Sequence, residues 1–342
     1  MSAASQSQPI IRIGVIGLGH WGPNHVRIFS SLPESRVVAV ADTDQTRRER
    51  IAASTPGVQT LARADTLVAL PEVDAVVVAT PTSTHYAVVK AALEAGKHVL
   101  CEKPLCTSSA EGEELAALAR AKNRVLMVGH IFLFNSSLQK VKELMDAGEI
   151  GDIRYISATR TNLGPVRNDI NAAWDLASHD IAVFNWLLGS EPVEVQAMGA
   201  SFLQPGIEDV VNINMKYPGN VLTSIQCSWL DPKKVRQMTI VGSKRMITWD
   251  DLSLSNPVAI YEKTVQTNME IGDYGEFLRL SMLDGDVHLP RIHATEPLKV
   301  QASAFIKAVQ TGDIPHSDSK CGVAVVRTLE KIDASLNSRA KS

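Results

Sequence analysis

Two acid–base groups lie four residues apart in the second half of the chain. Asp175 and His179 belong to the run WDLASHDIAVFNWLLG, whose spacing predicts a helix from about Asp175 to Leu188 that ends at Gly189. Residues i and i+4 of a helix share a face, so both side chains can reach one ligand. An imidazole, with an ordinary pKa of about 6.5, can pass a proton at neutral pH. The alternative is a helix-start aspartate beside an ordinary polar histidine.

A lysine at the end of an apolar strand is the third candidate for chemistry. In the run KHVLCEKP, Lys103 follows the predicted strand and Pro104 restricts the backbone beside it. Doubly wound sheets bind ligands at the carboxyl ends of their strands, so an ammonium there can meet a substrate hydroxyl. Beside a cationic ligand the lysine would become a better proton acceptor. The alternative is a solvated lysine.

The composition of the 342-residue chain excludes some classes of protein. At roughly 150 residues per domain, the length favours two domains, each large enough for its own core. Lys and Arg number 34 and Asp and Glu 37, so the net charge of −3 gives no broad attraction to nucleic acid or anionic membranes. We therefore expect neither nucleic acid nor a membrane as a partner.

The cysteines indicate a reducing compartment and no metal. Cys101, Cys106, Cys227 and Cys321 form neither a CxxC pair nor a dense disulfide framework. No further histidine or cysteine stands at ligand spacing from His179, so no zinc site is expected. Residues 1–9 lack the features of a signal peptide and are predicted to be a disordered tail on a cytoplasmic protein.

The elements that position these groups differ between the two halves of the chain. Between residues 10 and 130, short runs that are apolar at nearly every position alternate with helix-period stretches. This pattern predicts an α/β fold with a doubly wound parallel sheet. The predicted strands are IIRIGVIG, RVVAVAD, DAVVVAT, KHVLCEK and RVLMVGH. Local helix signals are Pro23 in a first turn, Asp44 as a cap, Gly96 after a helix, and a capping box of Ser108 and Glu111.

Residues 131–330 are predicted to form an α+β domain with a large, mainly antiparallel, open-faced sheet, followed by a tail at 331–342. Alternating runs separated by turn residues support this, as does the turn at 217–220. These runs are IRYISATRT, VEVQAMGASF, VVNINMKY, NVLTSIQCSWL, RQMTIVGS and RMITWDD. Only two helices are evident, the one that ends at Gly189 and a late one, EPLKVQASAFIKAVQTG.

A glycine-rich turn follows the first predicted strand. The turn has the pattern G-x-G-x-x-G and opens the first helix, which is the context that gives the pattern meaning. Its glycines suit a tight turn, close approach of a pyrophosphate and close helix packing, and the helix N-terminus faces the phosphates. We therefore expect residues 10–130 to be a Rossmann dinucleotide-binding domain, rather than to contain a turn without a ligand. The cofactor-binding residues of the turn are predicted to be Gly17, Gly19, His20, Trp21 and Gly22.

An acidic residue ends the second predicted strand. Asp42 stands twenty residues after Gly22, where a carboxylate can accept both hydroxyls of an adenosine ribose. The same carboxylate would repel the 2′-phosphate of NADP, so NAD is the expected cofactor. Arg47 and Arg48 lie close enough in sequence to keep NADP possible.

Several motifs together resemble those of the glucose-fructose oxidoreductase / inositol dehydrogenase / rhizopine-catabolism family of NAD(P)-dependent dehydrogenases. They are the glycine turn, P-x-x-x-H from Pro81 to His85, E-K-P from Glu102 to Pro104, GHIFLFN, and WDLASHDIAVFNWLLG. The combination of E-K-P at a strand end with D-x-x-x-H some seventy residues later is specific, whereas either motif alone would be weak. The resemblance covers nearly the whole chain.

The resemblance implies roles for particular residues. It assigns proton transfer from a sugar or polyol hydroxyl to Lys103 and His179, with Asp175 as partner, while hydride passes to the nicotinamide. It places further residues beside the cofactor, namely Thr80, Pro81, His85, Glu102 and Lys103. Substrate contacts are expected from Lys103, Arg160, Arg167, Asn171, Asp175 and His179. His85 could instead be a helix-start residue without a ligand.

The resemblance is greatest to members that oxidise the 3-hydroxyl of nucleotide-linked hexoses. The stretches NLGPVRNDINAAWDLASHD and SWLDPKKVRQMTIVGSKRMITWDD carry this narrower similarity. A dehydrogenase of a free sugar, a disaccharide or inositol is the nearest alternative. A non-catalytic NAD(P)-binding sensor of the same fold is another, although the presence of Lys103, Asp175 and His179 argues against it.

The predicted second sheet indicates self-association. Its runs place Val221, Thr223 and Ile225 on one face and Leu222 and Ser224 on the other, with few helices to cover them. A broad exposed sheet face with apolar and small residues is often an interface. Members of the similar family stack such sheets, so a homodimer or homotetramer through this domain is expected, with Val221 and Thr223 at its interface.

Overall fold

The structure is a computed structural model that describes residues 9–262, 264–272, 275–283 and 285–339. The chain divides into two compact units. The first contains residues up to 134 together with 295–330, and the second contains residues 135–294 and those from 331 onward. Of the predicted N-terminal tail, residues 1–8 lie outside the described residues.

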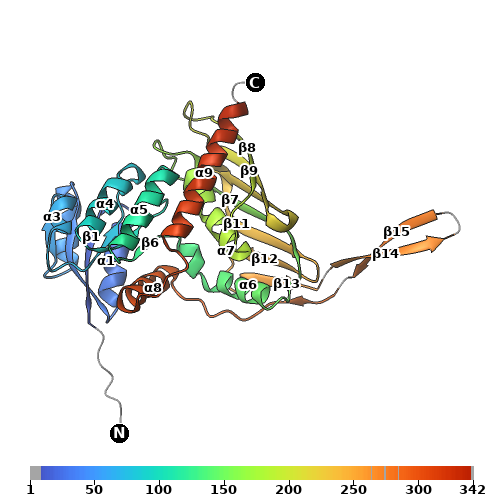
Figure 1. Cartoon of the computed structure of the whole chain (residues 1–342), viewed down its shortest axis with the longest axis horizontal. Coiled ribbons are helices and arrows are strands. Elements are labelled where there is room, and N and C mark those ends of the chain that lie inside the picture. Colours follow the sequence, from blue (N-terminus) through green and yellow to red (C-terminus); the bar gives the residue numbers. More distant parts are fainter. Residues whose placement is uncertain (1–8, 263, 273–274, 284, 340–342) are drawn as a thin grey trace, which may run out of the picture. The chain divides into compact units, whose positions relative to one another are not determined.

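The first unit is built on a six-stranded sheet in the order β3-β2-β1-β4-β5-β6, in which every pairing is parallel (Figure 1). The strands are β1 (Ile11–Ile16), β2 (Ser35–Ala41), β3 (Gln59–Leu61), β4 (Ala75–Val78), β5 (His98–Cys101) and β6 (Leu126–Val128). All four residues of β4 are fully buried, as expected of a strand covered on both faces. The predicted doubly wound α/β fold is confirmed.

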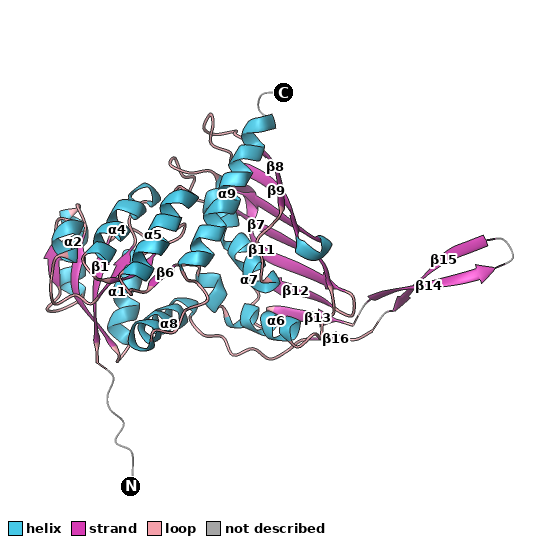
Figure 2. Ribbon diagram, in the orientation of Figure 1, coloured by secondary structure: helices cyan, strands magenta, loops and turns pink. Residues whose placement is uncertain are grey.

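Helices connect these strands and complete the first unit (Figure 2). They are α1 (Gly22–Ser31), α2 (Gln45–Ser54), α3 (Ala64–Val68), α4 (His85–Glu94) and α5 (Ser109–Ala121), with short 3₁₀ turns at Thr82–Thr84 and Ile131–Phe134. Later in the chain come α8 (Pro297–Thr311), in the first unit, and α9 (Ser319–Arg339), whose residues after 330 belong to the second unit.

Most of the local helix signals are confirmed. Pro23 lies in the first turn of α1, the Asp44 side chain accepts a hydrogen bond from the Arg47 N–H, and Gly96 has a φ of +75° directly after α4. Ser108 is the N-cap position of α5, but its side chain makes no capping hydrogen bond.

The capping box at Ser108 is therefore wrong, because a distant carboxylate replaces it. Glu330 of α9 accepts hydrogen bonds from the Ser109 N–H at 2.8 Å and from the Ser109 hydroxyl at 2.5 Å. No sequence signal near α5 could reveal a partner that is 221 residues away.

The unit boundaries differ from the expected domains in the last quarter of the chain. Residues 295–330 belong to the first unit because α8 packs on α1, where Phe305 meets Phe29 edge to face. The Ser317 hydroxyl also bonds to the Val128 carbonyl at the end of β6. Residues 331–339, expected to be a tail, continue helix α9.

The second unit contains an eight-stranded sheet in the order β16-β13-β12-β11-β7-β10-β9-β8. Its strands are β7 (Ile153–Leu163), β8 (Glu194–Ala200), β9 (Val210–Tyr217), β10 (Val221–Ser228), β11 (Leu230–Gly242), β12 (Met246–Asp250), β13 (Val258–Tyr261) and β16 (Val287–His288). Neighbours are antiparallel except β7 and β10, which are parallel. The predicted mainly antiparallel sheet is confirmed, and a separate hairpin joins β14 (Thr264–Gly272) to β15 (Gly275–Leu283).

One face of this second sheet packs on helices α6 (Ser136–Asp146) and α7 (Ser178–Leu188). The Tyr217 hydroxyl donates to Asn185 of α7 at 2.7 Å, and the Trp249 indole donates to Ser137 of α6 at 2.7 Å. Helix α6 was not predicted from the sequence. On the opposite face Leu222 is 54% exposed.

The face proposed for self-association needs a correction within this sheet. Val221 and Thr223 are buried, because they alternate with Leu222 and lie on the helix-covered side. Substitutions at these two positions would disturb the core rather than an open surface. The open face instead carries Leu222 and Ser224.

Candidate functional site

The glycine turn between β1 and α1 has the backbone that a dinucleotide needs. Gly17 has a φ of +90°, and a side chain there would lie 2.6 Å from the Ala79 carbonyl oxygen. A side chain at Gly22 would overlap the Gly17 carbonyl. At Gly19, by contrast, the nearest atom to an added Cβ is an Arg47 nitrogen at 3.9 Å, so this side of the turn is open. These residues fit a pyrophosphate held at the N-terminus of α1.

A cavity of about 220 Å³ adjoins the turn. Two arginines of α2, Arg47 and Arg50, lie at its wall. Its lining residues are Leu18, Gly19, His20, Pro23, Arg47, Arg50 and Ile51. The cavity thus combines the open backbone of the turn with positive charge, which suits a phosphate-bearing ligand.

Asp42 connects the end of β2 to the glycine turn. Its Oδ2 accepts a hydrogen bond from the Leu18 N–H at 2.6 Å, and its Oδ1 accepts one from the Asp44 N–H at 2.8 Å. Arg47 lies 3.7 Å from Oδ2, and the carboxylate is only 7% exposed. The contact with Leu18 was not foreseen from the sequence, and the contact of Asp42 with a ribose stays a prediction.

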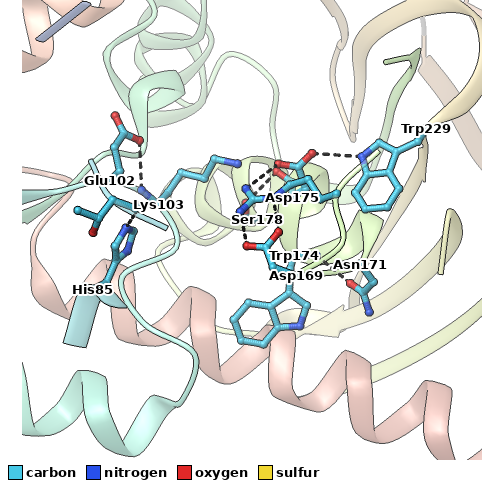
Figure 3. Close-up of polar contacts among 11 residues, drawn as sticks. His85, Glu102, Lys103, Asp169, Asn171, Trp174, Asp175, Ser178 and Trp229 are labelled. Carbon is cyan, nitrogen blue, oxygen red and sulfur yellow. Dashed lines mark hydrogen bonds and ion pairs between the residues drawn. The ribbon is translucent and has the colours of Figure 1, made fainter. Parts of the chain in front are cut away.

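The residues around Lys103 gather at the carboxyl ends of β4 and β5. Figure 3 shows Glu102, Lys103 and His85 in this region. Glu102 accepts from His25 at 2.7 Å through Oε1 and from the Lys103 N–H at 3.3 Å through Oε2. Burial raises the pKa of Glu102, but the hydrogen bond from His25 and the charges of His25 and Lys103 outweigh it, so the pKa lies below its ordinary value. Glu102 is therefore a largely buried carboxylate beside the candidate base.

His85 connects the two strand ends. Its Nδ1 lies 2.8 Å from the Pro104 carbonyl oxygen, and its Nε2 lies 2.8 Å from the Thr80 carbonyl oxygen. The ring is 1% exposed, so the structure places it beneath the loops rather than on their surface. The Thr80 hydroxyl accepts from Thr84 at 2.8 Å, and Pro81 is exposed. Contacts of these residues with the nicotinamide stay predictions.

His130 follows β6 at the same sheet edge and is also buried. Burial, together with the charge of Lys103, lowers the pKa of His130 to about 3, so the ring is neutral. Within the part of the chain that the structure describes, neither of its ring nitrogens has a hydrogen-bond partner. A neutral histidine leaves the Lys103 region without a second positive charge from this position.

In the second unit, Asp175 lies on a π-helical turn, Ala173–Ala177, that precedes α7. A π turn is rare and often accompanies a functional site. Figure 3 shows the Asp175 carboxylate directed at Trp229, whose indole nitrogen donates to Oδ2 at 3.2 Å. Arg167 approaches the other carboxylate oxygen at 3.7 Å. His179 lies half-buried on the first turn of α7, which ends at Gly189 as predicted.

Three of the six expected substrate residues, Arg160, Arg167 and Asn171, have different surroundings. Arg167 holds Asp169 with two hydrogen bonds of 2.9 and 2.6 Å, so it belongs to the polar group around Asp175. Arg160 is instead 3% exposed and pairs with Asp180 of α7 through two hydrogen bonds of 2.7 and 2.9 Å. The structure therefore places Arg160 in a buried ion pair of the second unit, and its contact with substrate stays a prediction.

Asn171 supports the start of the π turn. Its Oδ1 accepts from the Trp174 N–H at 3.2 Å, and its amide donates to Glu208 at 3.0 Å and to Asp333 at 3.3 Å. The Trp174 indole also donates to Asp333, at 2.8 Å. Glu208 and Asp333 belong to no motif, and Trp229 lies in a stretch noted only for its overall similarity. No local pattern therefore indicated their part in this group.

Among the described residues, no group of three or more His, Cys, Asp or Glu side chains is arranged to hold a metal ion. No helix in the described ranges is long and apolar enough to cross a membrane.

Comparison with known proteins shows which family has this architecture. The oxidoreductase family with an NAD-binding Rossmann fold, GFO_IDH_MocA, matches residues 11–130, and the GFO/IDH/MocA C-terminal domain matches residues 138–248. UDP-N-acetylglucosamine 3-dehydrogenase of Acidithiobacillus ferrooxidans is 32% identical over 75% of this chain and 79% of that protein. Its crystal structure superimposes with a TM-score of 0.80, covering 96% of this chain and 98% of that chain at 28% identity.

A second relative is named for a different activity. Inositol 2-dehydrogenase 1 of Saccharopolyspora erythraea is 39% identical over 54% of this chain, an alignment that spans 56% of the relative. The parallel sheet with its open dinucleotide turn, followed by a second unit with a mainly antiparallel sheet, is the architecture of an NAD-dependent oxidoreductase. The chain belongs to the GFO/IDH/MocA family of oxidoreductases, which confirms the resemblance seen in the sequence.

Proposed function

We propose that the protein transfers a hydride between a CH–OH group of a sugar and NAD, with the 3-hydroxyl of a nucleotide-linked hexose as the reacting group. The observation that carries this proposal is the position of Lys103 at the carboxyl end of β5, in the sheet that also carries the open glycine turn. The relative that acts on UDP-N-acetylglucosamine supports the substrate class, because its alignment spans 79% of its own length.

The proposed chemistry divides between the cofactor and the side chains. When bound, NAD accepts the hydride released as the carbinol C–H bond breaks. Lys103 and His179 are the groups proposed to accept the proton of the substrate hydroxyl, since an amine and an imidazole can both accept a proton near neutral pH. Asp175, already directed at Trp229 and near Arg167, is assigned to orient His179 or a neighbouring sugar hydroxyl.

The test is a substrate panel. Purified protein is offered NAD with UDP-N-acetylglucosamine, other UDP-sugars, free hexoses and myo-inositol, and the formation of NADH is followed by absorbance. The proposal expects turnover with a nucleotide sugar. Turnover only with inositol or free sugars would support the second candidate, which the 39% identity to an inositol dehydrogenase favours. NAD binding without any turnover would favour a sensor.

Self-association through the open face of the second sheet is a further part of the proposal. Leu222 and Tyr155 pair across β10 and β7 on this face and are 54% and 44% exposed. Met198 of β8 adds a third apolar side chain, 63% exposed. Apolar side chains on a broad sheet face favour burial against a second copy as a homodimer or homotetramer.

Light scattering with matched variants tests the assembly. A monomer mass near 37.1 kDa at micromolar concentration would contradict it. Leu222→Glu should dissociate the oligomer, whereas Leu254→Glu, at a turn residue that is 98% exposed, should leave it intact. An oligomer that survives Leu222→Glu would place the interface elsewhere.

The cytoplasm is the proposed location. All four cysteines are free thiols, and three of them are buried, which suits a reducing compartment. Fractionation of cells that express the protein tests this, and recovery with the extracellular or membrane fraction would contradict it.

A further inference from the structure

Two buried histidines contact the residues before and after Lys103 in the sequence. His25, on α1, is fully buried and contacts Glu102, the residue before Lys103, at 2.7 Å. His85, at the start of α4, contacts the carbonyl of Pro104, the residue after Lys103, at 2.8 Å. The E-K-P segment is therefore held from two different helices of the same unit.

The contact between His25 and Glu102 fixes the protonation of the imidazole. A carboxylate only accepts, so Nε2 of His25 carries the proton and donates to Oε1 of Glu102. Nδ1 of His25 is buried and, among the described residues, has no partner, so a proton there would leave an unsatisfied donor. The other Glu102 oxygen accepts from the Lys103 N–H at 3.3 Å. Hydrogen bonds thus run from His25 through the carboxylate to the main chain of Lys103.

His85 contacts the residue that follows Lys103 and also the loop after β4. Both of its partners, the carbonyls of Pro104 and Thr80, only accept. Both contacts can be hydrogen bonds at once only when each ring nitrogen carries a proton. In that form the ring ties the loop after β4 to the loop after β5, directly beside Lys103.

We propose that His25 and His85 are positioning residues that fix the Lys103 main chain from opposite sides. The proposal rests on the proposed function, in which Lys103 takes part in proton transfer. Reacting groups must be held closely, since a misplacement of about 1 Å can lower a rate about 100-fold. Neither histidine needs to touch substrate for this role.

Isosteric variants test each hydrogen bond separately. The amide nitrogen of glutamine replaces histidine Nε2, and that of asparagine replaces Nδ1. His25→Gln therefore keeps the bond to Glu102, and His25→Asn loses it. His85→Asn keeps the bond to Pro104 and loses that to Thr80, whereas His85→Gln does the reverse. The preferred substitution is thus opposite at the two positions.

We expect kcat to be higher in the variants that keep the hydrogen bond to Glu102 or to Pro104, the neighbours of Lys103. With NAD and UDP-N-acetylglucosamine, or whichever sugar of the panel turns over, kcat of His25→Gln should exceed that of His25→Asn about tenfold or more. His85→Asn should exceed His85→Gln in the same way. The Kd for NADH, measured by fluorescence, should stay within about threefold in all four variants. Equal kcat within each pair, or losses matched by weaker NADH binding, would overturn the proposal.

Lys103→Met separates this proposal from the proposed function. Loss of turnover in Lys103→Met with no preference within the histidine pairs would reject the positioning role alone. Retained turnover in Lys103→Met would reject the part of Lys103 in the reaction, and the positioning role with it.

A spectroscopic measurement requires no substrate. Side-chain ¹⁵N NMR of the full chain should show His25 with a proton on Nε2 and His85 with a proton on each ring nitrogen. Each signal is assigned by its loss in the corresponding variant. A His25 ring without a proton on Nε2, or a His85 ring with one nitrogen unprotonated, would contradict the proposed bonds.

Discussion

The Asp42 carboxylate accepts a hydrogen bond from the main-chain N–H of Leu18 at 2.6 Å, which joins the end of β2 to the glycine turn. Asp42 is thus an anchor for the turn as well as a candidate contact for the adenosine ribose. A substitution at this position must affect the shape of the turn as well as the charge.

We predict that NAD(H) binds more tightly than NADP(H), because the Asp42 carboxylate repels a 2′-phosphate. Asp42→Ala should narrow this preference and also weaken NADH binding, since the anchor of Leu18 is lost. Asp42→Asn is the matched control, because its amide oxygen can still accept from Leu18. Dissociation constants for both cofactors check this. Tighter NADP(H) binding by the unaltered protein would show that Arg47 and Arg50 of the adjacent cavity dominate.

Removing either proton-transfer candidate should abolish turnover without unfolding the protein. Lys103→Ala and His179→Ala should each lower kcat by about 10²–10⁴-fold, the usual contribution of a positioned acid or base. NADH binding and the circular dichroism spectrum should be retained. Lys122→Ala, at an exposed position after α5, is the control. Near-native turnover in one of the two variants would remove that residue from the mechanism.

Arg160 should matter for stability. Its guanidinium and the Asp180 carboxylate are 4% and 3% exposed, so removing one partner leaves a buried charge unpaired. Arg160→Met should lower the free energy of unfolding by roughly 3–5 kcal/mol in urea titrations. Arg154→Met, at an exposed position of the same strand, should change it little. A stable Arg160→Met with a raised KM would contradict this structural role and support the expected substrate contact.

Stability should fall as the pH is lowered below about 6.5, the ordinary pKa of histidine. Burial, with the charge of Arg124, lowers the pKa of His98 to about 4, and Nδ1 of His98 accepts from the Val125 N–H. Between these pH values the unfolded chain binds a proton that the folded chain does not, so acid favours unfolding.

The predicted loss from His98 is at most about 1.4 kcal/mol per pH unit. His98→Asn keeps an acceptor near Nδ1 and does not titrate, so the free energy of unfolding should depend less steeply on pH between 4 and 6.5. His293→Asn, at an exposed loop position, should leave the slope unchanged. An unaltered slope in His98→Asn would assign the acid sensitivity to other groups.

The sequence predicted those parts of the fold that local pattern determines. The five predicted strands of the first sheet are apolar at nearly every position, and Pro23, Asp44 and Gly96 act within a turn of their own positions. Contacts between distant residues were missed, because no local pattern encodes them. Glu330 replaces the expected cap at Ser108, and Asp180 forms a buried ion pair with Arg160 that no motif indicated.

The candidate site was predictable to the same extent. Lys103, Asp175 and His179 were identified from motifs, while the groups that surround them, such as Trp229 and His25, have no signature of their own. The faces of the second sheet show the same limit. Alternation separates Val221 from Leu222, but only the placement of α6 and α7 shows which face is covered.

Helix α1 contributes both to the dinucleotide turn and to the support of the Lys103 segment. Its first residue, Gly22, closes the dinucleotide turn, and three residues later His25 reaches the carboxylate next to Lys103. A design that exchanges the glycine turn and α1 for those of an NADP-dependent enzyme would therefore also replace the support of the candidate base. Such a graft should recover activity only when His25 is kept. A change of cofactor preference through this helix must therefore leave His25 in place.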